Sequence, residues 1–245
     1  MITTIKNWNG KEIKVTTSRG GVKAVCNYED NLIIPNKSIW PHPDIVKKLY
    51  KSNHENAFDE KNFSNLGFYC DLQSLRSEDA ITWSVFGTLH YFSKEKQVQF
   101  VNSLLKLIGV EHHVSDCFIQ LWTRIAHPET RVSGGPELDF QIVANNVVVF
   151  GEAKWRSKVA NNQGIHGNRS QLELREKYFE EFGTKIFPNA PAKIILIVGL
   201  DSQLKNCQLG PNCHYVNWKR ICEGTEHPMK DELTKYYAWK EKYGN

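Results

Sequence analysis

Short runs in which apolar and polar residues alternate, separated by turns that contain glycine, mark the first part of the chain. Asn9-Gly10 lies between Thr3–Trp8 and Glu12–Thr17, and this dipeptide between two such runs is typical of a β-hairpin with a type I′ turn. Residues 52–75 are polar and rich in asparagine, which predicts a loop. We predict that residues 1–74 form a β-rich extension, which would serve in target recognition or dimerisation.

From Ser77 onward the apolar positions follow helices and strands in turn. Ser77 is a good N-cap for a first helix, and a second helix is predicted from about Lys94 to Ile108. Further helices are predicted over Ser170–Phe182 and Asp231–Tyr243. Strands are predicted over Asp116–Ile125, Leu138–Ala144, Val147–Trp155, Lys193–Leu200 and His214–Trp218. The order helix, strand, strand, strand, helix, strand predicts an α/β domain over residues 75–245, in which helices cover both faces of a mixed sheet.

The strand Val147–Trp155 carries two charged side chains on a face that is otherwise apolar. Because side chains alternate along a strand, Val148, Phe150, Glu152 and Lys154 share one face. A buried carboxylate and a buried ammonium group are costly unless they are paired or bound to a metal. An ion pair on a solvated face is the alternative, and the two apolar neighbours make it less favoured.

The turn at Asn145-Asn146 predicts which residues of the two flanking strands lie opposite each other. With pairing centred on that turn, Asp139 lies across from Glu152. Two carboxylates in this position repel unless a divalent cation lies between them. Such a site suits phosphodiester hydrolysis assisted by Mg²⁺, with Mn²⁺ as a substitute, and Lys154 would orient the attacking water or stabilise the transition-state charge.

The segments Pro136-Glu137-Leu138-Asp139 and Gly151-Glu152-Ala153-Lys154 together resemble the bipartite motif of the PD-(D/E)XK, or restriction-endonuclease-like, nuclease superfamily. The order of elements over residues 77–200 resembles the αβββαβ core of that superfamily. The resemblance implies a metal-dependent nuclease in which Asp139, Glu152 and the Ala153 carbonyl bind the metal and Lys154 assists hydrolysis. Pro136 departs from the motif, because two residues separate it from Asp139.

The resemblance implies roles for two more residues. Glu78, on the apolar stripe of the first helix, matches an acidic metal ligand that many members carry there. The alternative is a first-turn glutamate that only interacts favourably with the helix dipole. Gln171 matches a glutamine that approaches the active site in some branches, and a capping or surface role is the alternative. In those branches a tyrosine follows four residues later, whereas this chain has Arg175 there and a tyrosine at Tyr178.

A basic stretch follows the proposed site and predicts contact with nucleic acid. Its members combine positive charge with one aromatic ring and are Trp155, Arg156, Lys158, His166 and Arg169. Such a stretch suits a phosphate backbone, and a solvated loop is the alternative. The net charge of +4 permits a nucleic-acid partner without requiring one.

Composition restricts the class of protein. Of the residues, 40% are hydrophobic and 24% are charged, as in ordinary globular domains, and no apolar run approaches the roughly 20 residues of a membrane span. The N-terminus lacks the pattern of a signal peptide, and six scattered cysteines do not form a disulfide framework, so we expect a cytoplasmic protein with reduced thiols. A zinc site is one possibility for the cluster of Cys207, Cys213, His214 and Cys222. Their spacing matches no standard zinc motif, so buried thiols are favoured.

These observations predict a Mg²⁺-dependent DNA endonuclease of the restriction or phage-defence type. Cutting both strands of a duplex needs two sites, so a homodimer is expected. Two alternatives stay open: a catalytically silent nucleic-acid-binding module of the same fold, and a nuclease directed at RNA or activated by a partner. An enzyme that uses Lys154 as a nucleophile is disfavoured, because that role needs a desolvated neutral lysine and the adjacent carboxylates favour the charged form.

Overall fold

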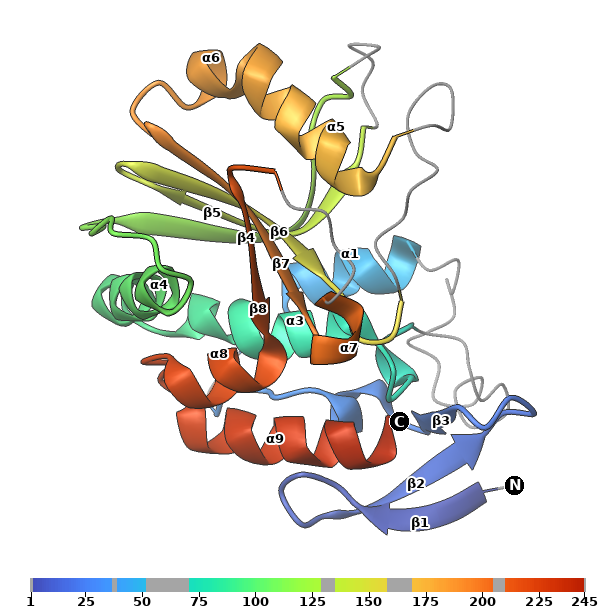
Figure 1. The fold of residues 1–245 in the computed structure, drawn as a ribbon. Coiled ribbons are helices and arrows are strands. Elements are labelled where there is room, and N and C mark those ends of the chain that lie inside the picture. The colour runs from blue at the N-terminus through green and yellow to red at the C-terminus, as the bar shows by residue number, and fades with distance from the viewer. Residues whose placement is uncertain are drawn as a thin grey trace. The chain divides into compact units, whose positions relative to one another are not determined.

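A computed structural model of the chain describes residues 2–36, 39–51, 71–128, 135–157, 169–204 and 210–244 (Figure 1). The chain divides into two compact units, one of Met1–Tyr91 with Met229–Asn245 and the other of Phe92–Pro228. The predicted boundary after residue 74 lies inside the first unit, which also contains the C-terminal helix. The division into a recognition extension and a nuclease domain stays a prediction. None of the helices formed by the described residues combines the length and the apolar character needed to cross a bilayer.

The first unit contains a three-stranded antiparallel sheet in the order β1-β2-β3. Its strands are β1 (Ile2–Lys6), β2 (Glu12–Thr17) and β3 (Lys23–Val25). The predicted hairpin is confirmed, but the two-residue type I′ turn is wrong, because Lys6 pairs with Glu12 and leaves a five-residue connection. The Asn7 side chain accepts hydrogen bonds from the backbone N–H groups of Asn9 and Lys11, at 3.2 and 2.9 Å. This side chain therefore organises a longer loop in place of the tight turn.

The helices of the first unit are α1 (Pro43–Lys51), α3 (Glu78–Phe86) and α9 (Lys230–Tyr243), with 3-10 turns η1 (Tyr28–Asn31), η2 (Asp71–Gln73) and η3 (Gly87–Tyr91). Ser77 caps α3 as predicted, because its hydroxyl accepts a hydrogen bond from the Ala80 N–H at 3.0 Å. Lys240 of α9 is fully buried, and its ammonium group donates to the Leu75 carbonyl at 2.8 Å. The C-terminal helix is thereby bonded to the segment that leads into α3.

The second unit contains a five-stranded mixed sheet in the order β4-β5-β6-β7-β8 (Figure 1). Its strands are β4 (Cys117–Arg124), β5 (Glu137–Ala144), β6 (Val147–Ala153), β7 (Ala192–Gly199) and β8 (Cys213–Asn217). The pairs β4·β5 and β5·β6 are antiparallel, whereas β6·β7 and β7·β8 are parallel. The predicted mixed sheet is therefore confirmed.

Helices flank this sheet on both faces, as the sequence predicted. One face is covered by α5 (Gln171–Tyr178), the π-helical turn η4 (Phe179–Gly183) and α6 (Thr184–Ile186) (Figure 1). The other face is covered by α4 (Lys94–Leu107) and α8 (Trp218–Gly224). The short helix α7 (Asp201–Leu204) follows β7. The predicted helix Ser170–Phe182 is regular only to Tyr178, because the chain then widens into η4. Phe179 in that turn stacks on Phe150 of β6, with ring centroids 4.2 Å apart.

The register between β5 and β6 is the one that the Asn145-Asn146 turn predicts. Phe140 pairs with Gly151 and Gln141 with Phe150. Gly151 is required here, because a Cβ at this position would lie 2.2 Å from the Phe140 ring. Every residue of β6 is buried, which places the end of this strand deep in the unit.

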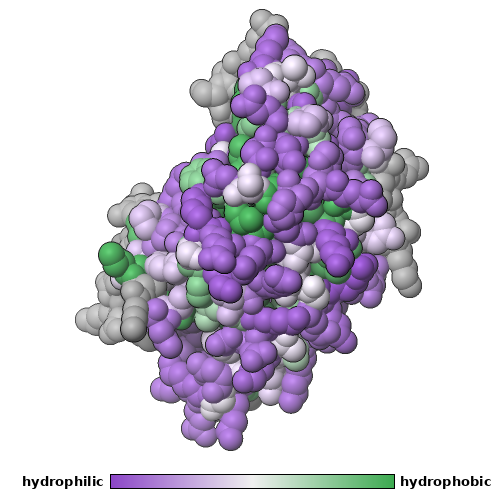
Figure 2. Space-filling view, turned by 90° about the vertical axis from the view of Figure 1, so that its left-hand side faces the viewer, coloured by the Kyte–Doolittle hydropathy of each residue, from purple (hydrophilic) through white to green (hydrophobic). Residues whose placement is uncertain are grey.

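The exposed surface of the described residues is mainly polar. Figure 2 shows one face of the molecule covered mostly by hydrophilic residues, between which hydrophobic residues form small patches. The large hydrophobic side chains that are exposed among the described residues come from separate segments, and they are Ile2, Ile39, Phe118, Ile186 and Tyr215. These side chains do not identify a docking surface, so the polar groups at the end of β6 are the main candidates for function.

Candidate active site

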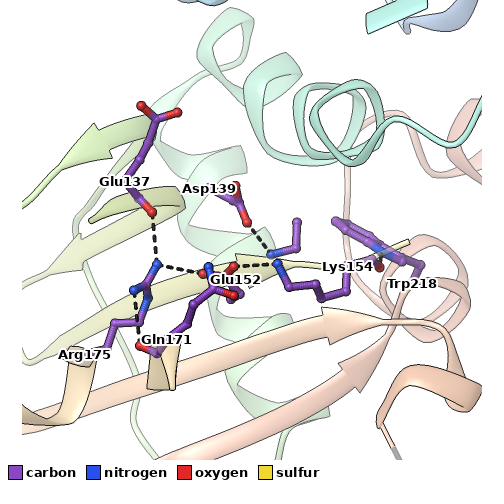
Figure 3. A network of polar contacts seen from close by, with 8 residues as sticks. Glu137, Asp139, Glu152, Lys154, Gln171, Arg175 and Trp218 are labelled. Atoms are coloured by element: carbon purple, nitrogen blue, oxygen red, sulfur yellow. Dashed lines mark hydrogen bonds and ion pairs between the residues drawn. The ribbon is translucent and has the colours of Figure 1, made fainter. Parts of the chain in front are cut away.

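Glu152 and Lys154 form a buried ion pair where β6 ends. The Lys154 ammonium donates to Glu152 Oε1 at 2.6 Å, and the two residues are only 6% and 2% exposed (Figure 3). The prediction that they are neighbours on one buried face is confirmed. Their burial excludes the alternative of an ion pair on a solvated face. A buried pair of this kind is stabilising only when its remaining donors and acceptors are also satisfied.

Asp139 on β5 lies beside the same end of β6. Its Oδ2 accepts a hydrogen bond from the Ala153 N–H at 2.7 Å (Figure 3). The Asp139 residue is partly buried. Because the N–H and C=O of one strand residue point to the same edge, the Ala153 carbonyl also faces the β5 side. Three of the groups that the resemblance implies as metal ligands, the side chains of Asp139 and Glu152 and the Ala153 carbonyl, therefore belong to this end of β6 and the strand beside it.

The neighbouring strand β4 is distorted opposite Asp139. Leu121 pairs with Phe140 and Thr123 with Leu138, which places Trp122 across from Asp139. Trp122 is buried and has a φ of +50°, a left-handed conformation that is unfavourable for a bulky residue. Such a conformation costs about 1–3 kcal/mol and is commonest where it serves a functional site. Sequence patterns predicted a regular strand here and contained no indication of this distortion.

Arg175 is the principal site residue that sequence reasoning missed. Its side chain is 1% exposed, and Nη2 lies 2.8 Å from Glu152 Oε2 and 3.0 Å from the Glu137 carbonyl (Figure 3). A second nitrogen, Nη1, donates to the Gln171 carbonyl at 3.2 Å. One feature of the sequence could have drawn attention to it. Arginine stands four residues after Gln171, where some branches of the superfamily carry tyrosine. Both carboxylate oxygens of Glu152 are thus engaged by cations.

Trp218, the first residue of α8, fixes the backbone of the lysine and was also missed. Its indole N–H donates to the Lys154 carbonyl at 2.8 Å (Figure 3). The Lys154 N–H in turn donates to the Val198 carbonyl of β7 at 2.7 Å. The lysine lies just beyond the last residue of β6, yet its backbone is held from two sides. This anchoring limits the positions that the ammonium group can reach.

Gln171 is the first residue of α5 and is partly buried. The predicted alternative of a capping role is wrong, because Ser170 is the N-cap and forms a capping box with Glu173. The hydrogen bond from the Ser170 N–H lowers the pKa of the Glu173 carboxyl. The approach of the Gln171 side chain to the site stays a prediction, while its carbonyl supports Arg175.

The remaining predicted residues have different placements. Glu78 lies in the first turn of α3, in the other compact unit, and its role as a metal ligand stays a prediction. Arg156 is exposed and Arg169 is partly buried, and their contact with nucleic acid stays a prediction. Trp155 is fully buried, so the predicted contact between its ring and nucleic acid does not fit this structure. Lys158 and His166 lie outside the described residues.

The donor set fits a hard divalent cation in type. Asp139 and Glu152 supply carboxylate oxygens and Ala153 a carbonyl oxygen, which are the ligands that Mg²⁺ prefers. Within the described ranges no group of three or more His, Cys, Asp or Glu side chains is arranged to hold a metal. Two side-chain ligands and a carbonyl would leave the remaining Mg²⁺ positions to water and phosphate oxygens.

The cysteines agree with the expectation of buried thiols. Cys213 and Cys222 are buried, and Cys207 lies outside the described residues. Burial raises the pKa of the Cys222 thiol, which keeps it protonated and unsuited to metal binding. The ring of His214 contacts the Ile108 carbonyl at 3.3 Å.

Comparisons of the chain with protein-family models, with curated proteins and with solved structures found no match. The functional argument therefore depends on the geometry of the buried charges at the end of β6 and on the motif they form.

Proposed function

We propose that this protein is a divalent-metal-dependent endonuclease that hydrolyses phosphodiester bonds in DNA, of the restriction or phage-defence type. The observation that carries the proposal is the buried Glu152–Lys154 pair beside Asp139 at the end of a central strand. The succession β4, β5, β6, α5 and β7 supports a restriction-endonuclease-like core, because it has the order of elements expected for that fold.

The roles of the residues follow from their positions. Asp139, Glu152 and the Ala153 carbonyl would hold Mg²⁺, or Mn²⁺ in its place. The bound metal supplies an acidified water and offsets the charge that develops on the phosphate. The Lys154 ammonium, already next to a ligand carboxylate, donates hydrogen bonds toward the attacking water or a phosphate oxygen. Burial strengthens these interactions, because the interior screens charge less than water does.

The partner in this proposal is DNA. Arg156 is exposed two residues beyond Lys154, and Arg169 lies just before α5, so both flank the proposed site in sequence. Positive side chains next to a hydrolytic site would hold the phosphate backbone without reading the base sequence. A homodimer would provide two sites for the two strands of a duplex.

A second candidate is a nucleic-acid-binding module of the same fold without turnover. The observation that favours it is the pairing of both Glu152 oxygens, with Lys154 and with Arg175. Asp139, Glu152, Lys154 and Arg175 have no net charge together, so this network needs no cation for neutrality. In this interpretation the four groups specify the packing of α5 on the sheet.

The test is a cleavage assay with the full chain on supercoiled plasmid, linear duplex, single-stranded DNA and RNA. Each substrate is incubated with Mg²⁺, Mn²⁺ or EDTA, and wild type is compared with Glu152→Ala and Lys154→Ala. Exposed residues of the same unit provide matched controls in Glu180→Ala and Lys185→Ala. We expect metal-dependent DNA cleavage by wild type and both controls and its loss in the two site variants.

The other outcomes separate the alternatives. Cleavage of RNA alone would redirect the proposal to an RNA nuclease. DNA binding without cleavage, unchanged by EDTA, would support the silent module. Cleavage that survives in Glu152→Ala would contradict the proposed site.

A further inference from the structure

The charges around Glu152 are unusual for a metal ligand. One carboxylate is paired with two cations, at 2.6 Å from Lys154 Nζ and 2.8 Å from Arg175 Nη2 (Figure 3). Only Lys154 belongs to the motif that identifies the proposed site. Arg175 therefore adds a positive charge at the place where a divalent cation would need to bind.

The positive charge of Arg175 is permanent. A guanidinium group does not lose its proton in proteins, and this one is 1% exposed, so water screens it poorly. Its position is fixed by the Glu137 and Gln171 carbonyls in addition to Glu152. Its Nε is buried and has no hydrogen-bond partner in the structure that is described. The guanidinium thus keeps one N–H donor that the described residues do not satisfy.

We propose, on the basis of the proposed nuclease function, that Arg175 is a positioning residue that couples metal binding to nucleic-acid binding. In the free protein it holds Glu152 and repels a divalent cation. A phosphodiester at the site brings negative charge that offsets both Arg175 and the metal, so the cation binds tightly only with nucleic acid present. Thermodynamic linkage requires that the metal then strengthens nucleic-acid binding by the same factor.

The test measures Mn²⁺ binding to the full chain from the spin-resonance signal of free Mn²⁺, with and without a short DNA duplex. Wild type is compared with Arg175→Met, which removes the charge, and with Arg175→Lys, which keeps it. Both variants lose the planar guanidinium, whose Nη1 and Nη2 contact the Gln171 and Glu137 carbonyls, so structural damage alone affects them alike. We expect DNA to tighten Mn²⁺ binding to wild type by at least about tenfold, within the usual range of coupling between sites.

The two variants should differ in the absence of DNA. Arg175→Met should bind Mn²⁺ about tenfold more tightly than wild type and gain less from DNA than wild type does, while Arg175→Lys should stay as weak as wild type. Glu152→Gln should weaken Mn²⁺ binding in every background. Unfolding curves of each variant establish that it is folded.

Failure of this inference is distinct from failure of the proposed function. Equal Mn²⁺ affinity in wild type and Arg175→Met, while wild type still cleaves DNA, would overturn the coupling and leave the nuclease intact. Absence of Mn²⁺ binding in wild type, with and without DNA, would overturn both. If Arg175→Met does not fold, an Mn²⁺ affinity of wild type that is unchanged by DNA overturns the coupling, and an affinity raised tenfold supports it.

Discussion

Lys240 is expected to make the stability of the protein depend on pH above neutrality. Burial lowers the pKa of its ammonium group from 10.5 to about 7, and Glu78 only partly opposes this effect. Because the folded-state pKa lies below the unfolded-state value, the unfolded chain binds more protons between pH 7 and 10.5. The free energy of unfolding therefore rises with pH across this window. Below pH 7 the cost of the buried charge is present in full, and above pH 10.5 it is absent.

The size of the effect follows from the two pKa values. The difference between 10.5 and about 7 corresponds to ~5 kcal/mol at about 1.4 kcal/mol per pH unit, of which about 4 kcal/mol is present at pH 7. Lys240→Met keeps most of the apolar stem and removes the charge, but it leaves the Leu75 carbonyl without its donor, at a cost of about 1–3 kcal/mol. We expect a net gain of about 1–3 kcal/mol at pH 7.

The assay is urea-induced unfolding of the full chain between pH 6 and 10. Lys240→Met should flatten the rise with pH that wild type shows and should be the more stable protein at neutral pH. Lys235→Met, at an exposed position of the same helix, should behave as wild type does. An identical pH dependence in wild type and Lys240→Met would refute the reasoning, because another group would then be responsible.

Two further predictions concern the buried network. Glu152→Gln should lower the free energy of unfolding, measured in urea, by about 3–5 kcal/mol, because Lys154 and Arg175 would stay buried without their counter-charge. A decrease below about 1 kcal/mol would contradict the observed pairing. Trp218→Phe removes the donor to the Lys154 carbonyl, so it should cost about 1–3 kcal/mol and reduce cleavage of plasmid DNA. Unchanged cleavage in this folded variant would show that the lysine needs no such anchor.

The parts of the structure that the sequence predicted are those set by neighbours in the chain. The register of β5 against β6 follows from the turn between them and from the alternation of side chains, and it places Asp139 beside Ala153. The N-cap at Ser77 is equally local. Burial of Glu152 and Lys154 followed from the apolar residues that precede them on the same strand. Patterns between near neighbours in the chain were therefore sufficient to predict strand β6, its register against β5 and the burial of Glu152 and Lys154.

The parts that could not be predicted depend on contacts between distant segments. Trp218 is 64 residues from Lys154 and Arg175 is 23 residues from Glu152, and helical spacing alone does not identify their partners. The loop at Asn7 is a local exception, because the Asn7 side chain accepts hydrogen bonds from backbone N–H groups two and four residues along the chain and replaces the predicted turn. The left-handed backbone of Trp122 is likewise not specified by any sequence pattern.

The most direct test of the proposed nuclease is the rate at which Asp139→Asn cleaves supercoiled plasmid in Mg²⁺. Asparagine keeps an oxygen that accepts from the Ala153 N–H, so the fold is preserved while the charge needed to bind the metal is lost. We expect a rate at least about a hundredfold below that of wild type and of the exposed control Asp116→Asn. Equal rates in the three proteins, or no cleavage by any of them, would contradict a nuclease site at this end of β6.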